Sequence, residues 1–389
     1  MAYISSNANR WYCAQESTYG QIPAITAANR IPAVKLETQT QLQKSLRKDK
    51  TGSRTWAGMP AGMRRETTFN ATSYMRNWAD QTVLPAYDPL FQAALGGAGV
   101  LWAGGTPASG TTASSVAFSS PHGLAVGQGV AWNGEIRFVA SVPDAQTAAL
   151  NAPFSSAPIS GLPLTPTASY GPATELPSVS FFDYWDPSTA VQRVLTGAAV
   201  DRLTVGVNGD FHQFGFRGQA QDVIDSASFA AGQGGATTFP AEPAVQSFCY
   251  SPVPGNLGEV WLGVIPGQFF TVSQASIELR NNLEMRSSEF GSSIPLGIAP
   301  GTREVELTLE LFAQDDAATT ALYQAARQQV PISVMLQLGQ VNGQLLGVWL
   351  KRLVPSVPEF DDGDNRLKWK FSDSRAQGCL DDEIAVAFG

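Results

Sequence analysis

The sequence predicts a mainly β protein made of two tandem copies of a β-sandwich or barrel, each with one flanking helix, plus a small inserted β-module. Three observations predict this class. Only 15% of the 389 residues are charged, whereas 37 are glycine and 25 are proline, a composition typical of packed, turn-rich β-structure. Short segments alternate polar and apolar residues, and one stretch of sequence occurs twice.

The repeat divides the chain. Residues 46–64 can be laid on residues 285–303 without a gap, and two shorter matches follow in the same order. The first alignment pairs Arg47 with Arg286, Gly52 with Gly291, Ser53 with Ser292, Gly58 with Gly297, Gly62 with Gly301, and Arg64 with Arg303. The shorter matches pair residues 90–94 with 322–326 and residues 209–216 with 363–371. The shared order predicts a duplicated domain.

Each copy is expected to hold the same elements in the same order. A first strand leads into a long loop rich in glycine and proline, and a second strand and a helix follow. The first strands are expected at residues 33–40 and 270–279, the loops at 44–63 and 281–301, and the helices at 89–95 and 315–327. Further strands are expected at residues 203–207, 213–216, 333–338, 345–350 and 367–371.

The second strand is clearest in the second copy, at residues 304–311. Polar and apolar residues alternate there with the period of two that places successive side chains on opposite faces of a sheet. The alternation predicts a core face of Val305, Leu307, Leu309 and Leu311, and a water-facing side of Glu304, Glu306, Thr308 and Glu310. An aspartate of the pair Asp315 and Asp316 is expected to cap the helix that follows.

The first copy is interrupted by residues 101–165. This segment is rich in Gly, Ala, Ser, Thr and Pro, and only Glu135, Arg137 and Asp144 are charged. Four short apolar stretches between turn sequences predict a small β-module that is displayed outward; a long ordered loop is the alternative. The expected boundaries are residues 1–100 and 166–240 for the first copy, 101–165 for the module, and 241–389 for the second copy.

The sequence carries no sign of catalysis. The two histidines, His122 and His212, lack metal-binding spacing, and the three cysteines are odd in number and widely spread. We therefore expect reduced thiols at Cys13, Cys249 and Cys379. Nucleophile-elbow and phosphate-loop motifs do not occur. We expect a protein that is not an enzyme and that binds no metal or cofactor.

Charge and hydropathy restrict the partners. The formal net charge is −8 at pH 7, so tight, sequence-independent DNA binding is not expected, because that mode places Lys and Arg against phosphates. The N-terminus lacks the basic and apolar regions of a signal peptide. No run of about 18 apolar residues occurs, so we expect no membrane-spanning segment.

Several stretches carry a family resemblance: residues 51–65, 255–263, 281–291, 299–303 and 311–319. With these stretches the sequence resembles the major tail tube proteins of long-tailed, non-contractile bacteriophages. The resemblance implies a β-sandwich with a flanking helix, whose sheets join around a ring into an inner barrel. Rings of six domains stack into the tube. Two copies per chain then imply that three chains imitate the six-fold ring.

The resemblance also implies partners and a location. The partners are further copies of the chain, a tape-measure protein, tail-tip and tail-terminator proteins, and double-stranded DNA that passes through without tight binding. The protein would be made in the cytoplasm of the bacterial host and would reside in the tail of the virion.

The resemblance assigns roles to two sets of residues. The long loops become arms that pack on the adjacent ring, and Arg47, Arg64, Arg286 and Arg303 then pair with acidic groups of the neighbour or remain solvated. The polar residues Glu304, Glu306, Thr308 and Glu310 become a lumen lining that repels phosphate.

Two alternatives remain. Another tail protein, such as a distal-tail or tail-terminator protein, would form a single ring and not a stack. A carbohydrate-binding or carbohydrate-cleaving β-protein would use the inserted module and its Trp132 as a ligand surface.

Overall fold

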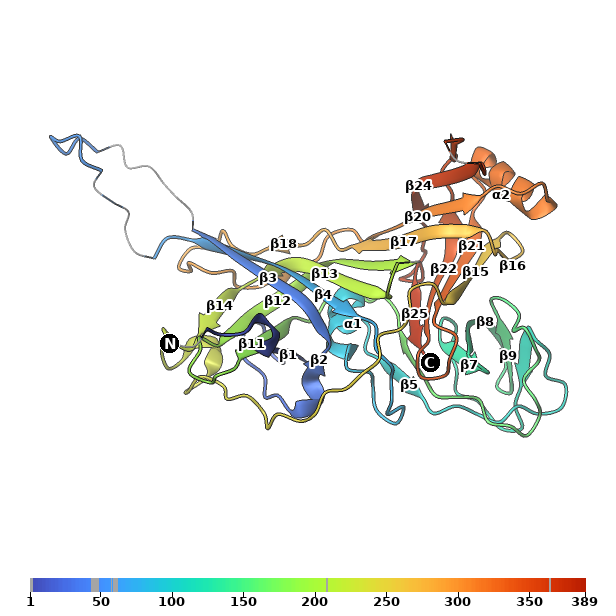
Figure 1. Ribbon diagram of the computed structural model, residues 1–389, viewed down its shortest axis with the longest axis horizontal. Coiled ribbons are helices and arrows are strands. Elements are labelled where there is room, and N and C mark those ends of the chain that lie inside the picture. The colour runs from blue at the N-terminus through green and yellow to red at the C-terminus, as the bar shows by residue number, and fades with distance from the viewer. Residues whose placement is uncertain (1–2, 43–48, 57, 59–61, 208, 364) are drawn as a thin grey trace.

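The protein is mainly β, as the sequence predicts, and its strands pair in antiparallel ladders (Figure 1). The computed structural model describes residues 3–42, 49–56, 58, 62–207, 209–363 and 365–389. Within these residues there are two α-helices, α1 (Asp88–Leu95) and α2 (Ala317–Gln328). Neither helix is long and apolar enough to cross a bilayer.

One antiparallel sheet, which we call the long sheet, runs through both halves of the chain (Figure 1). Its strands, in order, are β3 (Ala33–Leu42), β4 (Arg65–Tyr74), β13 (Gln213–Ala220), the C-terminal part of β12 (Arg193–Val207), β17 (Val272–Arg280), β20 (Glu304–Phe312), β24 (Lys368–Ala376) and β23 (Glu359–Asp361). The ladder between β12 and β17 joins the half that comes first in the sequence to the second half.

Each half also contributes an outer sheet. The first outer sheet holds β2 (Arg30–Ile31), β1 (Asn9–Gln15), β11 (Val179–Trp185), the N-terminal part of β12, and β14 (Asp222–Asp225). The second outer sheet holds β16 (Gly267–Gln268), β15 (Gly258–Gly263), β21 (Ile332–Leu338), β22 (Leu346–Val354), β25 (Ala385–Phe388), β10 (Thr167–Tyr170) and β5 (Val100–Trp102). Strands β5 and β10 therefore pair with the second half, although all of their residues fall in segments that the sequence assigns to the first copy or its module.

The two halves repeat one strand order. The order β3-β4-β13-β12 in the long sheet corresponds to β17-β20-β24-β23, and the order β1-β11-β12-β14 in the outer sheets corresponds to β15-β21-β22-β25. The repeat in the sequence is therefore accompanied by a repeat in the pairing of strands.

The register corrects the gap-free alignment of the two loops. Core-facing Thr40 lies opposite Thr67 in the first half, and core-facing Leu279 lies opposite Val305 in the second. Because Thr40 corresponds to Leu279 but Thr67 to Val305, the second loop is one residue shorter than the first. Arg65, and not Arg64, is therefore the counterpart of Arg303.

Helix α1 packs where the two halves meet. It begins with Pro89 in its first turn and ends at Gly96, whose positive φ of 93° suits glycine at a helix terminus. Its Phe91 lies 5.3 Å, centroid to centroid, from Phe214 of the long sheet and 5.2 Å from Phe388 of the second outer sheet. The halves consequently share one hydrophobic core.

Helix α2 confirms the predicted capping. The Asp316 carboxylate accepts a hydrogen bond of 2.6 Å from the Thr319 N–H, so Asp316 is the N-cap. Leu322, Ala325 and Ala326 form the buried side of the helix, at the spacing that an amphipathic helix requires.

The inserted segment contains the four predicted strands. They pair in the order β6 (Ser115–Ala117), β9 (Thr147–Leu150), β8 (Glu135–Asp144) and β7 (Gly129–Trp132). Val116, Val130 and Phe154 belong to a small hydrophobic core of its own. The module is not merely displayed outward, because one of its faces packs on the second outer sheet.

His212 holds the connection between the halves in place. Its backbone N–H donates to the Val253 carbonyl at 3.0 Å, and its ring Nε2 lies 2.8 Å from the Leu257 carbonyl. The side chain is almost wholly buried. Burial lowers the pKa of His212 from its ordinary value near 6.5, because the charged imidazolium loses hydration.

Acidification is therefore expected to weaken the fold at this position. A lowered folded-state pKa means that the unfolded chain binds the proton more readily, so the stabilisation is present above about pH 6.5 and is lost as the pH falls below it. His212→Gln should lose less stability than the wild type between about pH 7 and pH 5.5 in urea unfolding. Equal losses in the two proteins would contradict this prediction.

Candidate functional site

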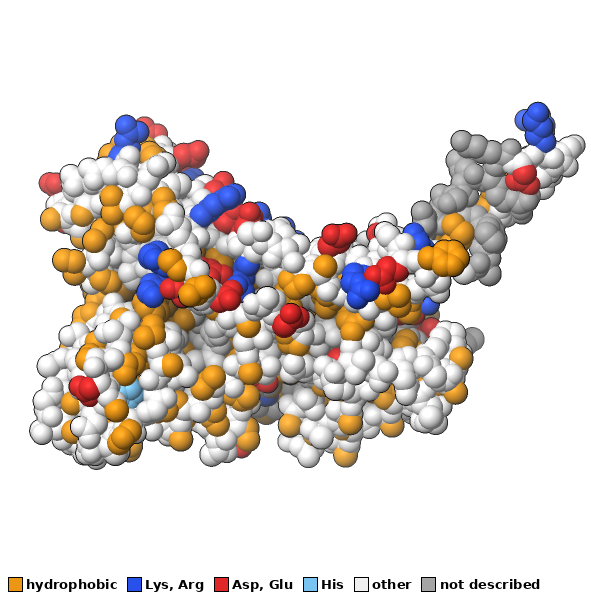
Figure 2. All heavy atoms as spheres, turned by 180° about the vertical axis from the view of Figure 1, so that it is seen from behind, with side chains coloured by type: hydrophobic (Ala, Val, Ile, Leu, Met, Phe, Trp, Pro, Cys, Tyr) orange, Lys and Arg blue, Asp and Glu red, His pale blue; other side chains and the backbone are white. Residues whose placement is uncertain are grey.

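The long sheet has one polar face, on the side away from the core. Alternation along each strand places charged and amide side chains there, and Figure 2 shows charged side chains gathered along the upper side of the molecule. The polar face includes Lys35, Glu37, Asn70, Arg217, Arg202, Glu278, Arg280, Glu304, Glu306, Thr308, Glu310, Lys370, Arg375 and Asp361.

In the first half, hydrogen bonds link this face across three strands. Glu37 of β3 binds the Lys35 ammonium at 2.5 Å and accepts from the Asn70 amide of β4 at 3.1 Å. The same Asn70 accepts from Arg217 Nε of β13 at 3.2 Å. These contacts lower the pKa of Glu37, the hydrogen bond from Lys35 being the largest cause.

A chain of ion pairs begins at the junction between the halves and continues across the second half. Glu278 of β17 lies 3.3 Å from Arg202 of β12 and also binds Arg280. Glu306 of β20 lies 3.3 Å from both Arg280 and Arg375. The hydrogen bond to Glu278 raises the pKa of Arg280, so this guanidinium stays charged. Each carboxylate is thus shared between two arginines.

The alternation predicted for residues 304–311 is confirmed in the core, but one acidic residue differs. Val305, Leu307, Leu309 and Leu311 are buried, and Thr308 is exposed. Glu306 is only 8% exposed, because Arg280 and Arg375 cover it from both sides. Glu304 and Glu310 are partly exposed, and Glu310 lies opposite Lys370. The acidic row is therefore interleaved with bases.

The second arm, residues 281–303, lies against the first half. Its short strands β18 (Glu284–Met285) and β19 (Ile298–Ala299) pair with each other. The Asn281 side-chain amide donates to the carbonyls of Ala94 and Val200, both at 2.9 Å, and Asn281 is 2% exposed. Further along, the Ser293 carbonyl accepts from the Arg65 N–H at 3.0 Å.

Three of the four predicted arm arginines have partners within their own chain. Arg47 lies outside the described residues. Arg64 donates to the Ser288 carbonyl at 2.8 Å, Arg286 pairs with Glu289 at 2.5 Å, and Arg303 pairs with Asp381 at 2.5 Å and Glu383 at 2.6 Å.

Arg65 and Arg303 have matching roles in the two halves. Each lies at the start of the second strand and pairs with an acidic residue at or just before the last strand. The Arg65–Asp222 distance is 2.7 Å and the Arg303–Glu383 distance is 2.6 Å. The sequence alignment missed this correspondence because it placed Arg64 opposite Arg303.

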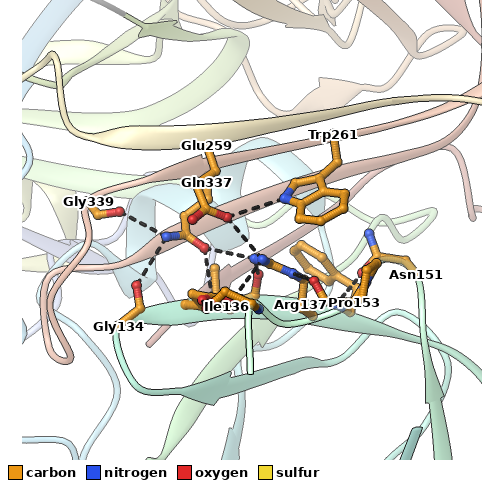
Figure 3. A network of polar contacts seen from close by, with 12 residues as sticks. Gly134, Ile136, Arg137, Asn151, Pro153, Glu259, Trp261, Gln337 and Gly339 are labelled. Atoms are coloured by element: carbon orange, nitrogen blue, oxygen red, sulfur yellow. Dashed lines mark hydrogen bonds and ion pairs between the residues drawn. The ribbon is translucent and has the colours of Figure 1, made fainter. Parts of the chain in front are cut away.

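A buried arginine attaches the inserted module to the second half (Figure 3). Arg137 of β8 is 0% exposed, and its Nη2 lies 2.7 Å from the Glu135 carboxylate of the same strand and 2.9 Å from the Glu259 carboxylate of β15. Nη1 donates to Gln337 Oε1 of β21 at 3.0 Å, and Nε donates to the Pro153 carbonyl at 2.9 Å. Trp261 covers the guanidinium, 5.0 Å from ring centroid to Cζ.

In the network around Arg137, nearby carboxylates offset the effect of burial on the guanidinium, and the Gln337 amide is fully hydrogen-bonded. Burial lowers the pKa of Arg137, and the carboxylates of Glu259 and Glu135 oppose that effect. Gln337 uses both ends of its amide, since Nε2 donates to the carbonyls of Gly134 and Gly339 while Oε1 accepts from the Ile136 N–H. Such saturation indicates a structural joint and not a reactive centre.

Apolar contacts surround this joint. Ile136 and Phe138 of the module pack with Trp349 and Ala387 of the second outer sheet. The rings of Phe138 and Trp349 stack 5.9 Å apart, centroid to centroid.

Glu16 is a second buried charged residue that the sequence did not single out. It follows β1 and is 7% exposed. Its carboxylate accepts four hydrogen bonds: from the Gly20 N–H at 2.7 Å, the Gly197 N–H at 2.7 Å, and the hydroxyls of Ser178 and Ser180 at 2.6 Å each. Glu16 therefore ties β1 to β11 and β12.

Among the residues that the structure describes, no three His, Cys, Asp or Glu side chains cluster as metal ligands. Cys13, Cys249 and Cys379 are free, as the sequence predicts. Burial raises the pKa of the Cys13 thiol. A scan against protein-family models and a search of the curated proteins found no match.

Proposed function

We propose that this chain is the structural subunit of a phage tail tube, which assembles into stacked rings around a channel for DNA. The observation that carries the proposal is the long sheet, which passes through both halves and ends on each side in an edge strand that has one neighbour only. In the described part of the chain, β3 pairs only with β4, and β23 pairs only with β24. The kind of assembly, a stack of rings, is inferred from the family resemblance of the sequence.

Unpaired sheet edges favour association between chains. An edge strand exposes backbone N–H and C=O groups that can extend a sheet into a neighbouring molecule. Strand β3 offers ten residues for this purpose. A sheet with two such edges can close into a ring of identical chains by pairing one edge with the other.

The repeat within the chain supports the proposed stoichiometry. Because each half contributes the same four-strand unit, one chain represents two steps around the ring. Three chains then make a homotrimeric ring with pseudo-six-fold symmetry.

The polar face suits the lining of a channel for DNA. Three of its arginines, Arg202, Arg280 and Arg375, are held by Glu278 and Glu306, and the fourth, Arg217, donates to Asn70. Phosphates passing along it would meet acidic and basic side chains in alternation, so double-stranded DNA and the tape-measure protein would slide without tight binding. On this proposal the protein resides in the virion tail and is made in the host cytoplasm.

Exposed apolar side chains at opposite ends of the strands favour stacking. Phe290 in the second arm lies beyond the C-terminal end of β17 and is fully exposed. Phe270 precedes β17, and Ile265 lies in the hairpin between β15 and β16; both are more than 80% exposed. Contacts between unlike ends are heterologous, and repeated they build an open stack.

Electron microscopy and light scattering of the purified chain test this proposal. Hollow tubes or rings with a mass of three chains are the expected result. A tail-terminator or distal-tail protein would form single rings without stacking. A chain that remains monomeric, both alone and with a tail-tip complex, would contradict the proposal. The carbohydrate alternative is less favoured because Trp132 packs against the core of the module.

A further inference from the structure

The junction between the two halves shows how an edge strand of one half pairs with an edge strand of the next. Arg202–Val207 of β12 pair with Ala275–Arg280 of β17. Val205 lies directly opposite Ile277, and both side chains are 2% exposed. Closure of this junction has therefore buried the core-facing side chains of both strands.

Each of the two strands that meet at this junction has a counterpart at one end of the long sheet, and these two counterparts do not pair with each other. Strand β3 is the counterpart of β17, because each is followed by a long loop and pairs with the second strand of its half. Strand β23 is the counterpart of the C-terminal part of β12, because each pairs with the third strand, β24 or β13. The chain therefore contains one such junction internally. The counterparts of its two strands lie at opposite ends of the long sheet, each with one side unpaired among the described residues.

The internal register can be carried over strand by strand. Ala71 lies opposite Phe216, and its counterpart Leu309 lies opposite Phe371, so Phe214 corresponds to Trp369. Val205 lies opposite Phe214, and Phe360 lies opposite Trp369. Phe360 is therefore the counterpart of Val205.

The same procedure applies to β3. Ile277 lies opposite Leu307, and Thr38 lies opposite Phe69, the counterpart of Leu307. Thr38 is therefore the counterpart of Ile277.

We infer that β3 of one chain pairs antiparallel with residues 357–362 of the next chain, with Thr38 opposite Phe360 and Gln39 opposite Glu359. This inference rests on the proposed function and adds the partner segments and their register. It makes the contact between chains a copy of the contact within the chain.

The apolar side of this contact is incomplete in the single chain. Phe360 stacks on Trp369 at 5.4 Å and lies 6.0 Å from Tyr323 of α2, yet it is 57% exposed. Leu36 and Thr38 lie on the core side of β3 and are only partly buried. Pairing in the inferred register would cover all three residues, as it covers Val205 and Ile277.

The polar side of the inferred contact places like charges opposite each other, each held by a counter-ion, as the internal junction does. There, Arg202 lies opposite Arg280, and Glu278 binds both. In the inferred contact Asp361 would lie opposite Glu37, each with its own cation, Lys370 at 2.7 Å and Lys35 at 2.5 Å. In both contacts, each of the two like charges that lie opposite each other is bound by a side chain of the other sign.

Disulfide formation between chains tests the register. In a background of Cys249→Ser and Cys379→Ser, the variant Gln39→Cys/Glu359→Cys should form covalent head-to-tail oligomers under mild oxidation. The matched controls Glu37→Cys/Glu359→Cys and Gln41→Cys/Glu359→Cys are displaced by two residues in each direction. They should cross-link at least several-fold more slowly, since diagonal neighbours lie about 7–8 Å apart, beyond ordinary disulfide geometry.

The outcomes separate the inference from the proposed function. Faster cross-linking of either control would overturn the register while leaving the ring intact. Rings that are visible by electron microscopy but do not cross-link in any pair would show that these edges do not meet. Absence of both rings and cross-links would overturn the inference and the proposed function together.

Discussion

Replacing Arg137 with methionine is expected to lower the free energy of unfolding by about 3–5 kcal/mol. The guanidinium is fully buried and binds the Glu135 and Glu259 carboxylates at 2.7 and 2.9 Å. Methionine fills a similar volume but leaves both carboxylates in a low-dielectric site without a cation. Urea unfolding followed by tryptophan fluorescence measures the loss, and Trp261 in the network reports on it directly.

Two further variants separate charge from packing. Arg286→Met removes an exposed ion pair with Glu289 and should cost no more than about 1 kcal/mol. Adding Glu135→Gln and Glu259→Gln to Arg137→Met removes the stranded charges and should restore much of the loss. If Arg137→Met destabilises no more than Arg286→Met, the network does not fasten the module to the second half.

Local patterns predicted the strands and helix that they describe. The period of two in residues 304–311 gave the correct core face, because burial of one face of a strand requires that period. The aspartate before α2 gave the correct helix start, since the cap depends on neighbouring residues alone. Interactions between neighbours in sequence are visible without the fold.

Contacts between distant residues were not predictable in this way. Glu306 has the same position in the alternation as Thr308, but Arg280 and Arg375 come from two other strands and bury it. Likewise, nothing near Arg137 in the sequence indicates Glu259 or Gln337 as partners. For that reason the sequence predicted a module that is displayed outward, whereas one of its faces packs on the second outer sheet.

The repeat was visible in the sequence, but its register was not. Glycines and arginines match in the two loops without a gap, yet the strands that flank them differ by one residue. Loops tolerate insertions, whereas a one-residue slip in a strand turns its core face to water. The structure therefore places the length difference in the loop, and Arg65 is the residue of the first half that corresponds to Arg303.

Glu16→Ala is expected to destabilise the protein by about 3 kcal/mol or more, since an unsatisfied buried donor costs roughly 1–3 kcal/mol. The carboxylate is the acceptor for the N–H groups of Gly20 and Gly197 and for the hydroxyls of Ser178 and Ser180. The hydroxyls can rotate to other acceptors, but the two backbone N–H groups are fixed. β1 should therefore detach more readily from β11.

The glutamine variant distinguishes lost acceptors from lost volume. Glu16→Gln keeps the size of the side chain but turns one acceptor oxygen into an N–H donor, which would face groups that also donate. Glu16→Gln should therefore lower the free energy of unfolding by more than half as much as Glu16→Ala does. Glu66→Ala, at an exposed position of β4, should change the urea midpoint little. Full stability of Glu16→Gln would mean that the pocket needs the volume of this side chain and not its two acceptor oxygens.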